Sequence, residues 1–265
     1  MSLRLSSLVT GIKHPVAALA YIRGPQALER WYQRFELGQF ERPFRLFEGV
    51  PKNWVRLNRN VTSIQALKKE INTRARKYAL NLEDLWFYAP YHWFYYLLVR
   101  WMKPERIIET GVWYGLSSAF LLQGLHDNGC GGLYSIDLPN VSYVNETGHV
   151  FRDYVGDESN TGCLVPESLR SRWYLTLGST QSKLPPLLDS LKEVDLFIRD
   201  SEHTYATMMF EFRSVWPHLK KAGVLVSDDA HQNNAFRDFA RSVPCKSVQI
   251  ERRLNEKMGI LLKEE

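Results

Sequence analysis

Short apolar runs alternate with segments of helical periodicity from residue 106 onward, and this alternation constrains the fold more than any other feature of the chain. The apolar runs are rich in branched and aromatic side chains, as strands are, and comprise residues 106–110, 132–137, 173–178, 194–200 and 223–229. Strand–helix alternation repeated five times predicts a parallel sheet whose two faces are covered by helices.

The two ends of the chain differ from this repeating part. Residues 247–253 and 258–263 alternate between apolar and polar side chains around a short connection, which predicts an antiparallel hairpin. Residues 1–81 read as helices and loops, with apolar and charged side chains mixed at helical spacing. We therefore predict an α/β fold over residues 82–265, with a doubly wound sheet of seven strands that is parallel except for its C-terminal hairpin. An N-terminal helical extension over residues 1–81 precedes this domain.

Acidic residues stand at the ends of three predicted strands. Asp137 ends the second strand, Asp200 ends the fourth, and the pair Asp228 and Asp229 ends the fifth. Right-handed crossover connections place the carboxyl ends of all parallel strands at one edge of the sheet. Because ligands of such folds bind at that edge, the sequence predicts a single site that gathers these carboxylates.

The segment ETGVWYGLSS follows the first predicted strand and opens a helix. Gly111 permits a tight turn, and Gly115 permits close approach of the backbone to a ligand at the helix N-terminus. Trp113 stands where dinucleotide-binding loops have a second glycine, so a nucleoside with a short charged tail fits better than a pyrophosphate. Asp137 is placed to bind ribose hydroxyls, and Glu109 suits an ammonium group or the loop amides.

These features resemble class I S-adenosylmethionine-dependent methyltransferases, which share the pattern Glu-x-Gly-x-x-x-Gly, the acid after the second strand and a closing hairpin. The resemblance covers roughly residues 82–263 and implies a Rossmann-like fold with S-adenosylmethionine as cofactor. In that family the glycine loop holds the methionine part, the acid holds the ribose, and the residues after the third strand, here GSTQS, flank the adenine. Many relatives carry an acid at the position of Ser179. The cofactor-binding residues that the resemblance implies are Glu109, Gly111, Trp113, Gly115, Ser117, Asp137, Gly178, Ser179 and Asp200.

The segments RDSEHTY and VSDDAH resemble metal-assisted O-methyltransferases, most closely bacterial enzymes that act on natural-product sugars and the related cephalosporin-hydroxylase-type family. There, an acid after the fourth strand and an acid pair after the fifth bind a divalent ion, usually Mg²⁺. The matching residues here are Asp200, Asp228 and Asp229. Catechol O-methyltransferase-like enzymes carry Asp-Asn at the last pair, where this chain has Asp-Asp.

Electrostatics favours a cation at this acidic cluster. Two carboxylates about 4 Å apart repel by about 4 kcal/mol at an effective dielectric constant of about 20. Three would take up protons unless a cation lies among them. Oxygen ligands suit Mg²⁺ or Ca²⁺, and no set of Cys or His residues suggests zinc. The alternative is that Asp228 or Asp229 caps the following helix.

Methyl transfer to a hydroxyl needs an oxygen that is deprotonated or nearly so. A metal would lower the pKa of the hydroxyl and align its oxygen with the methyl group, and a base would help to remove the proton. We expect Asp200 and His203 to be catalytic, with His203 or His231 as the base; a purely structural role is the alternative for each histidine. Arg199 has no explanation at this stage.

The expected function is thus metal-assisted O-methylation of a small hydroxylated acceptor, and three others compete with it. A catalytically silent module would keep the nucleoside pocket and act through its helical N-terminus. An N-methyltransferase without metal would carry an Asn/Asp-Pro-Pro-aromatic run where this chain has DSEH. A nicotinamide oxidoreductase is disfavoured by Trp113.

Composition limits the partners and the compartment. The net charge of +5 comes from scattered Lys and Arg, so we expect no nucleic-acid partner. No apolar run reaches the ~20 residues of a membrane span, and the N-terminal apolar piece is too short for a signal peptide. Three cysteines without metal or disulfide spacing favour a reducing, cytoplasmic location.

Two segments have open roles. The aromatic stretch 85–101 could pack in the core, wall the acceptor pocket or form the seam of a homo-oligomer. The long polar segment 139–172 is either a lid or substrate loop, or a plain surface insertion.

Overall fold

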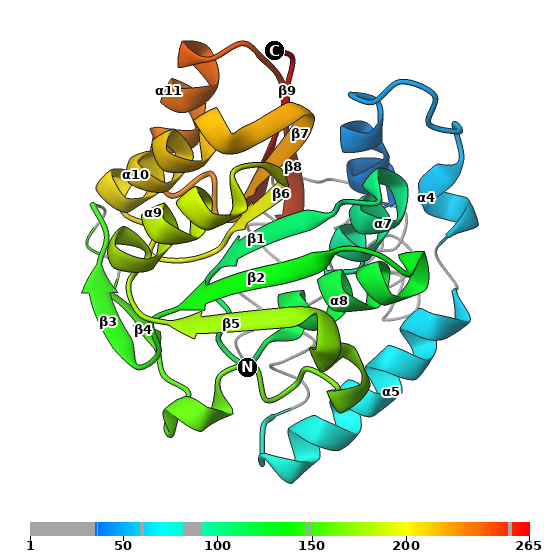
Figure 1. Cartoon of the computed structure of the whole chain (residues 1–265), viewed down its shortest axis with the longest axis vertical. Coiled ribbons are helices and arrows are strands. Elements are labelled where there is room, and N and C mark those ends of the chain that lie inside the picture. The colour runs from blue at the N-terminus through cyan, green and yellow to red at the C-terminus, as the bar shows by residue number, and fades with distance from the viewer. Residues whose placement is uncertain are drawn as a thin grey trace, which may run out of the picture.

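The computed structural model of the chain describes residues 35, 37–58, 61–81, 92–146, 148, 150–253 and 256–265. In these ranges one seven-stranded sheet has the order β5-β2-β1-β6-β7-β9-β8 (Figure 1). Its strands are β1 (Arg106–Thr110), β2 (Gly132–Asp137), β5 (Trp173–Leu177), β6 (Val194–Arg199), β7 (Leu219–Ser227), β8 (Cys245–Arg253) and β9 (Glu256–Lys263). The first five pair in parallel, and β9 pairs antiparallel with β7 and β8. The predicted Rossmann-like sheet with its C-terminal antiparallel hairpin is confirmed.

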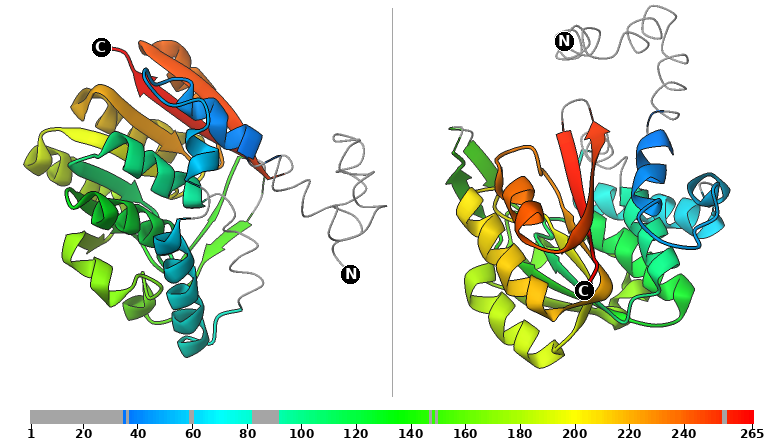
Figure 2. Two further views of the ribbon diagram at one scale, coloured as in Figure 1. Left: turned by 90° about the vertical axis from the view of Figure 1, so that its right-hand side faces the viewer. Right: turned by 90° about the horizontal axis from the view of Figure 1, so that it is seen from above.

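Side chains that alternate along the central strands enter two separate cores. The helices are α4 (Trp54–Leu57), α5 (Thr62–Lys77), α7 (His92–Met102), α8 (Leu116–Asn128), α9 (Thr180–Leu191), α10 (Tyr205–Val215) and α11 (Ala235–Ser242). Ile107 and Leu196 share a core with α5, α7 and α8, whereas Ile108 and Phe197 share one with α9, α10 and α11. Figures 1 and 2 show these two groups of helices on opposite faces of the sheet.

The described residues between 35 and 81 pack against the domain that follows them. Phe40, Ile64 and Ile71 are buried in the same core as Phe94 of α7. Because the side chains of α7 are largely buried in this core, the C-terminal part of the aromatic stretch 85–101 serves internal packing. The rest of that stretch, residues 85–91, lies outside the described residues, and so do residues 1–34 of the predicted extension.

The segment between β2 and β5 forms a small structure of its own. It contains a two-stranded antiparallel sheet of β3 (Val141–Val144) and β4 (Val150–Asp153), followed by two short 3₁₀ helices, η1 (Glu158–Asn160) and η2 (Glu167–Arg172). A hairpin therefore stands where the neighbouring connections of the sheet have a helix.

Two expectations about the surroundings of the protein can be compared with this fold. None of the described helices is long and apolar enough to cross a membrane. Cys130, Cys163 and Cys245 are free.

A glycine is needed where the ends of β1 and β6 meet. Gly111 has φ of +84°, and a Cβ atom added to it would overlap the backbone carbonyl of Asp200. Gly111→Ala should lower the free energy of unfolding by roughly 3 kcal/mol or more, because a left-handed conformation and a backbone clash are both imposed. Urea denaturation would measure the loss.

Gly129 supplies the matched control. It has φ of +74° at the end of α8, but a Cβ atom there would meet nothing within 4 Å. Gly129→Ala should cost only about 1–2 kcal/mol, the penalty of the left-handed conformation. Equal losses in the two variants would show that the close approach to Asp200 is unimportant.

Candidate functional site

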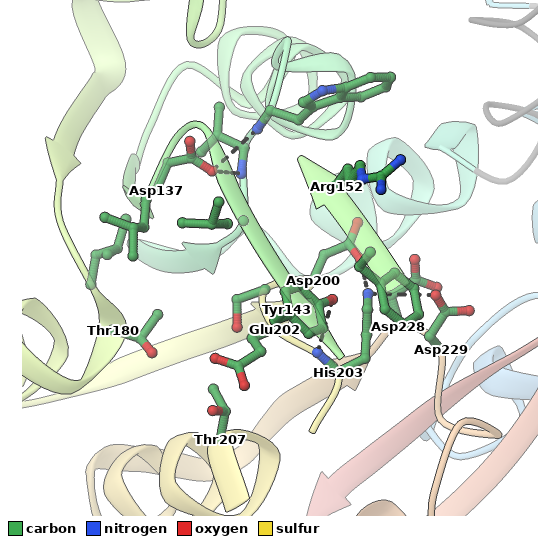
Figure 3. Close-up of a pocket in the computed structure, with 18 of the residues that line it drawn as sticks. Asp137, Tyr143, Arg152, Thr180, Asp200, Glu202, His203, Thr207, Asp228 and Asp229 are labelled. Atoms are coloured by element: carbon green, nitrogen blue, oxygen red, sulfur yellow. Dashed lines mark hydrogen bonds and ion pairs between the residues drawn. The ribbon is translucent and has the colours of Figure 1, made fainter. Parts of the chain in front are cut away.

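A cavity of about 960 Å³ opens at the carboxyl edge of the parallel strands. The loops that follow β1, β2, β6 and β7 line it, together with the β3–β4 hairpin. Figure 3 shows Asp137 at one end and the group of Asp200, His203, Asp228 and Asp229 at the other. The predicted convergence of strand-end acids on one site is thus present in the structure, and the volume is that of a site for a cofactor-sized ligand.

The glycine loop after β1 is fastened to the end of β2. Asp137 Oδ1 accepts hydrogen bonds from the backbone amides of Val112, at 2.7 Å, and Trp113, at 3.2 Å. Burial raises the pKa of Asp137, and the two amide donors oppose that rise. With Oδ1 engaged by the loop, Oδ2 is the oxygen best placed to accept from a ligand hydroxyl.

Glu109 has a different environment from the one expected for it. It is fully buried, does not line the cavity, and accepts hydrogen bonds from the hydroxyls of Ser117, Ser118 and Ser135 at 2.6–2.7 Å. Burial raises its pKa to about 6, although the three hydroxyl donors lower it. The loop amides, one of the two partners expected for Glu109 beside an ammonium group, are bound by Asp137 instead.

The other predicted cofactor residues divide into two groups. Gly111, Trp113, Ser117, Ser179 and Asp200 line the cavity together with Asp137. Gly115 and Gly178 are not lining residues, and both have positive φ: Gly115 lies immediately before α8, and the Gly178 amide donates to the carbonyl of Asp137 at 2.7 Å.

The acids after β6 and β7 are brought together by the ladder of the sheet. The Asp200 amide donates to the Thr110 carbonyl, and the Asp228 amide donates to the Arg199 carbonyl, so both acids continue the strand pairing. His203 Nε2 lies 3.9 Å from Asp200 Oδ1 and 3.5 Å from Asp229 Oδ2. Two of the three predicted metal ligands therefore flank one imidazole.

His231, the second histidine considered as a base, lies beside Asp229. His231 Nδ1 is 3.7 Å from Asp229 Oδ1. Asp228 is 2% exposed and Asp229 is 9% exposed, so both carboxylates lie in a largely water-excluded part of the cavity.

The N-cap residue of α11 is Asn234, whose side chain makes no cap hydrogen bond. Asn233 Oδ1 accepts from the Ala235 amide at the first turn of α11.

No group of three His, Cys, Asp or Glu side chains within the described ranges is arranged to hold a metal ion.

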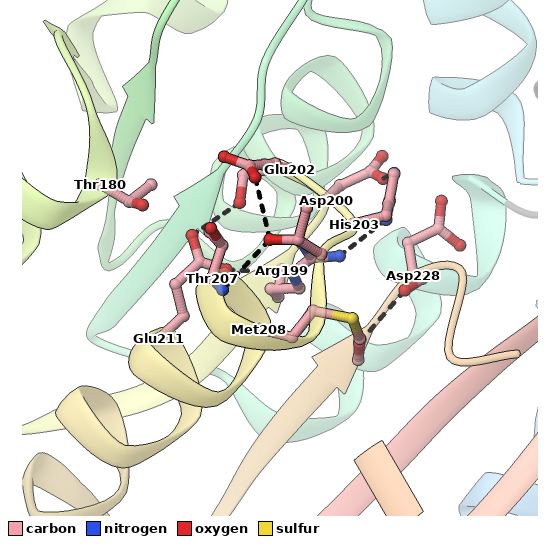
Figure 4. A network of polar contacts seen from close by, with 12 residues as sticks. Thr180, Arg199, Asp200, Glu202, His203, Thr207, Met208, Glu211 and Asp228 are labelled. Carbon is pink, nitrogen blue, oxygen red and sulfur yellow. Dashed lines mark hydrogen bonds and ion pairs between the residues drawn. The ribbon is translucent and has the colours of Figure 1, made fainter. Parts of the chain in front are cut away.

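The end of the cavity that holds Asp200, His203, Asp228 and Asp229 is called the acid end below. Arg199, which the sequence left unexplained, is wholly buried behind this acid end (Figure 4). Its Nε lies 3.0 Å from Oε2 of Glu211, which is also fully buried, and its Nη1 lies 2.7 Å from His203 Nδ1. Ser201 donates a further hydrogen bond of 2.6 Å to Glu211 Oε1. Burial raises the pKa of Glu211, and the neighbouring Arg199 opposes that rise.

The hairpin of the long insertion closes the acid end. The rings of Tyr143 and Phe151 stack with centroids 4.9 Å apart, and the Phe151 ring lies 5.3 Å from that of His203. The Tyr143 hydroxyl accepts from the His203 amide at 3.1 Å, and Glu146 accepts from the Tyr205 amide. The insertion is therefore part of the cavity wall.

Several lining residues were missed by sequence reasoning. Leu138 lies next to the predicted residue Asp137, and that adjacency was a usable signal, whereas Thr180 belongs to the segment GSTQS that was expected to flank the adenine. Tyr143, Phe151 and Arg152 had no signal beyond the length of the insertion that contains them.

Glu109 generates a pH-dependent prediction. Its folded-state pKa of about 6 exceeds the ordinary value of 4.5, so the folded chain keeps a proton that the unfolded chain has lost. The free energy of unfolding should therefore fall as pH rises through this window, by about 2 kcal/mol. Glu109→Gln should remove this component, and urea denaturation of both proteins at a series of pH values would measure it.

Glu158→Gln, at an exposed position, controls for the loss of one acidic charge. If the difference between wild type and Glu109→Gln stays constant across the window, the raised pKa is wrong.

Comparison with known proteins agrees with this geometry. Residues 108–230 match the model of a family described as a methyltransferase domain. No curated protein sequence matches the chain significantly.

Solved structures are similar in fold at low sequence identity. An O-methyltransferase from Bacillus cereus in complex with SAH has a TM-score of 0.50 and 15% identity, covering 77% of this chain and 92% of its own. The O-methyltransferase TomG from Streptomyces achromogenes, in complex with SAM, has a TM-score of 0.53 and 18% identity, covering 78% and 91%. The SAH-bound methyltransferase PaMTH1 from Podospora anserina has a TM-score of 0.53 and 12% identity, covering 76% and 88%.

The family match extends from β1 to the residue after the acid pair, Ala230, and so includes Asp137, Asp200, Asp228 and Asp229. Residues 108–230 of this chain therefore form a class I S-adenosylmethionine-dependent methyltransferase domain.

Proposed function

We propose that the protein transfers the methyl group of S-adenosylmethionine to a hydroxyl oxygen of a small molecule. The observation that carries the proposal is the two-ended cavity, in which a nucleoside-type end at Asp137 continues into an acid end at Asp200 and His203. The similar structures named as O-methyltransferases support oxygen as the acceptor atom. TomG, named as involved in tomaymycin synthesis, supports a small-molecule acceptor.

In this proposal the cofactor lies along the loops after β1, β2 and β5. Gly111, Trp113 and Ser117 contact its methionine part, Asp137 Oδ2 accepts from a ribose hydroxyl, and Ser179 flanks the adenine. Glu109, Gly115 and Gly178 act indirectly, because they shape the loops without lining the cavity. Asp200 stands where the two ends meet, since its backbone adjoins both Thr110 and Gly111.

The chemistry of the acid end fits removal of a proton from the acceptor. In methyl transfer an oxygen–carbon bond forms, a sulfur–carbon bond breaks, and the hydroxyl proton must leave. Asp200 and His203 are the proposed catalytic residues. Asp228 and Asp229 add negative charge beside them, and this negative potential attracts the proton that the acceptor hydroxyl loses. The hairpin side chains Tyr143 and Phe151 cover the acceptor and limit the access of water.

A divalent ion, Mg²⁺ by donor chemistry, is a separate part of the proposal. Asp200, Asp228 and Asp229 would hold it, and carboxylate oxygens are the ligands that such a hard ion prefers. When bound it would lower the pKa of the acceptor hydroxyl. The described side chains are not arranged as a metal-binding group, and His203 lies beside two of the three acids. The transfer proposed above therefore takes no step through the ion.

Cofactor binding tests the first part. Asp137→Asn should weaken the binding of S-adenosylmethionine roughly 10- to 100-fold, because a charged acceptor of ribose hydroxyls is lost. Isothermal titration calorimetry would measure it. Asp189→Asn, an exposed change on α9, is the control and should bind as the wild type does. Equal affinities in the two variants would contradict the proposed cofactor position.

Metal removal tests the second part. Mg²⁺ should bind the wild type in calorimetric titration and should bind Asp228→Asn/Asp229→Asn at least about tenfold more weakly, since two of three carboxylates are lost. The double variant should retain wild-type affinity for S-adenosylmethionine. If Mg²⁺ gives no heat and EDTA leaves the turnover of labelled cofactor with a hydroxylated acceptor unchanged, the ion is not part of the mechanism, whereas the transfer itself stands.

A further inference from the structure

Methyl transfer gives no reason for the ion pair of Arg199 and Glu211. Neither residue has any exposed surface, and they meet at 3.0 Å between β6 and α10. A buried ion pair is a poor source of stability, because an apolar pair of similar volume is often as stable or more so. A pair placed directly behind the acid end therefore invites an explanation beyond packing.

The contact of Arg199 with His203 supplies that explanation. Arg199 Nη1 lies 2.7 Å from His203 Nδ1, and both groups are buried. A guanidinium group has only donors, so Nδ1 must be the acceptor and carries no hydrogen. A neutral imidazole then has its single proton on Nε2.

Two backbone contacts of His203 help to fix where that Nε2–H group points. The His203 amide donates to the Tyr143 hydroxyl, and its carbonyl accepts from Asn233 Nδ2 at 3.0 Å. With the backbone held from both sides and Nδ1 held by Arg199, Nε2 faces Asp200 Oδ1 and Asp229 Oδ2 at 3.9 and 3.5 Å.

We infer that Arg199 is a positioning residue: anchored by Glu211, it fixes His203 as the tautomer whose Nε2–H group faces the carboxylates of Asp200 and Asp229. The role of this tautomer in catalysis rests on the proposed function, whereas the tautomer itself depends only on the contact between Arg199 and His203.

The consequence is a change in the role expected for His203. A ring whose Nδ1 accepts from arginine and whose Nε2 already carries hydrogen has no lone pair for the acceptor proton. His203 therefore faces Asp200 and Asp229 with an N–H group, and the proton released when oxygen takes the methyl group passes to a carboxylate oxygen. The sulfonium charge and one carboxylate charge are neutralised together, leaving S-adenosylhomocysteine and the methyl ether.

The test is the tautomer of His203, observed by long-range ¹H–¹⁵N NMR of histidine-labelled protein at one fixed pH above neutrality. The wild type should show one His203 spin system with an unprotonated Nδ1 and a protonated Nε2. His203→Gln assigns this signal by its disappearance.

The informative variant is Arg199→Met/Glu211→Met, which removes the ion pair without leaving a buried charge unpaired. Its His203 signal should become a mixture of both tautomers. Ser201→Ala is the matched control, since it removes one contact of Glu211 but leaves the contact between Arg199 and His203, and it should keep the wild-type pattern. A wild-type ring protonated at Nδ1, or an unchanged pattern in the double variant, would overturn the inference.

Cofactor titrations on the same samples separate this inference from the proposed function. Both variants should bind S-adenosylmethionine with wild-type affinity, and with a competent acceptor the double variant should lose about tenfold or more in kcat at an unchanged KM for the cofactor. If no protein binds the cofactor, the proposed function fails while the tautomer result remains valid. An unchanged kcat in a double variant of mixed tautomers would refute the positioning role.

Discussion

Parallel strand pairing is the constraint on which the whole site depends. Each parallel crossover returns the chain to the same side of the sheet, so residues that follow different strands meet at one edge. The register of β1, β6 and β7 fixes the backbone positions of Asp200 and Asp228, because the amides of these residues donate to carbonyls of the neighbouring strands. The side chains of these acids are thereby fixed on backbone that cannot shift without breaking the central ladder.

Two carboxyl groups, those of Glu109 and Glu211, are fully buried near this edge of the sheet, and their charges are compensated in different ways. Glu109 has three serine hydroxyls around it, and burial raises its pKa to about 6. Glu211 has an arginine, which opposes the rise in pKa that burial causes. The first arrangement joins β1, β2 and the start of α8, the elements that shape the glycine loop. The second joins β6 and α10, the elements on either side of the loop that carries Asp200 and His203.

The sheet and the convergence of acids could be predicted from sequence because both follow from periodicity and topology. The strand-end positions of Asp137, Asp200, Asp228 and Asp229 needed no knowledge of side-chain direction. The role of Glu109 was a harder problem: its position just inside β1 was correct, but alternation along the strand turns its side chain away from the cavity, toward serines that lie 8, 9 and 26 residues away in sequence. The β3–β4 hairpin could not be predicted either, since its contacts with His203 and Tyr205 depend on tertiary packing of a polar segment without clear periodicity.

The contact between Arg199 and His203 also affects how the negative charge of the acid end is compensated. If His203 is held neutral by Arg199, it adds no positive charge to the three carboxylates, although it lies between two of them. Arg152 and His231 line the same cavity, and the sulfonium of a bound cofactor would add a further positive charge. Only the sulfonium disappears when the methyl group is transferred, so the reaction leaves the carboxylates less well compensated than before unless one of them takes the acceptor proton. Charge balance thus favours transfer of the acceptor proton to a carboxylate, and it depends on the sulfonium and the acids, whereas the proposed tautomer of His203 depends on Arg199.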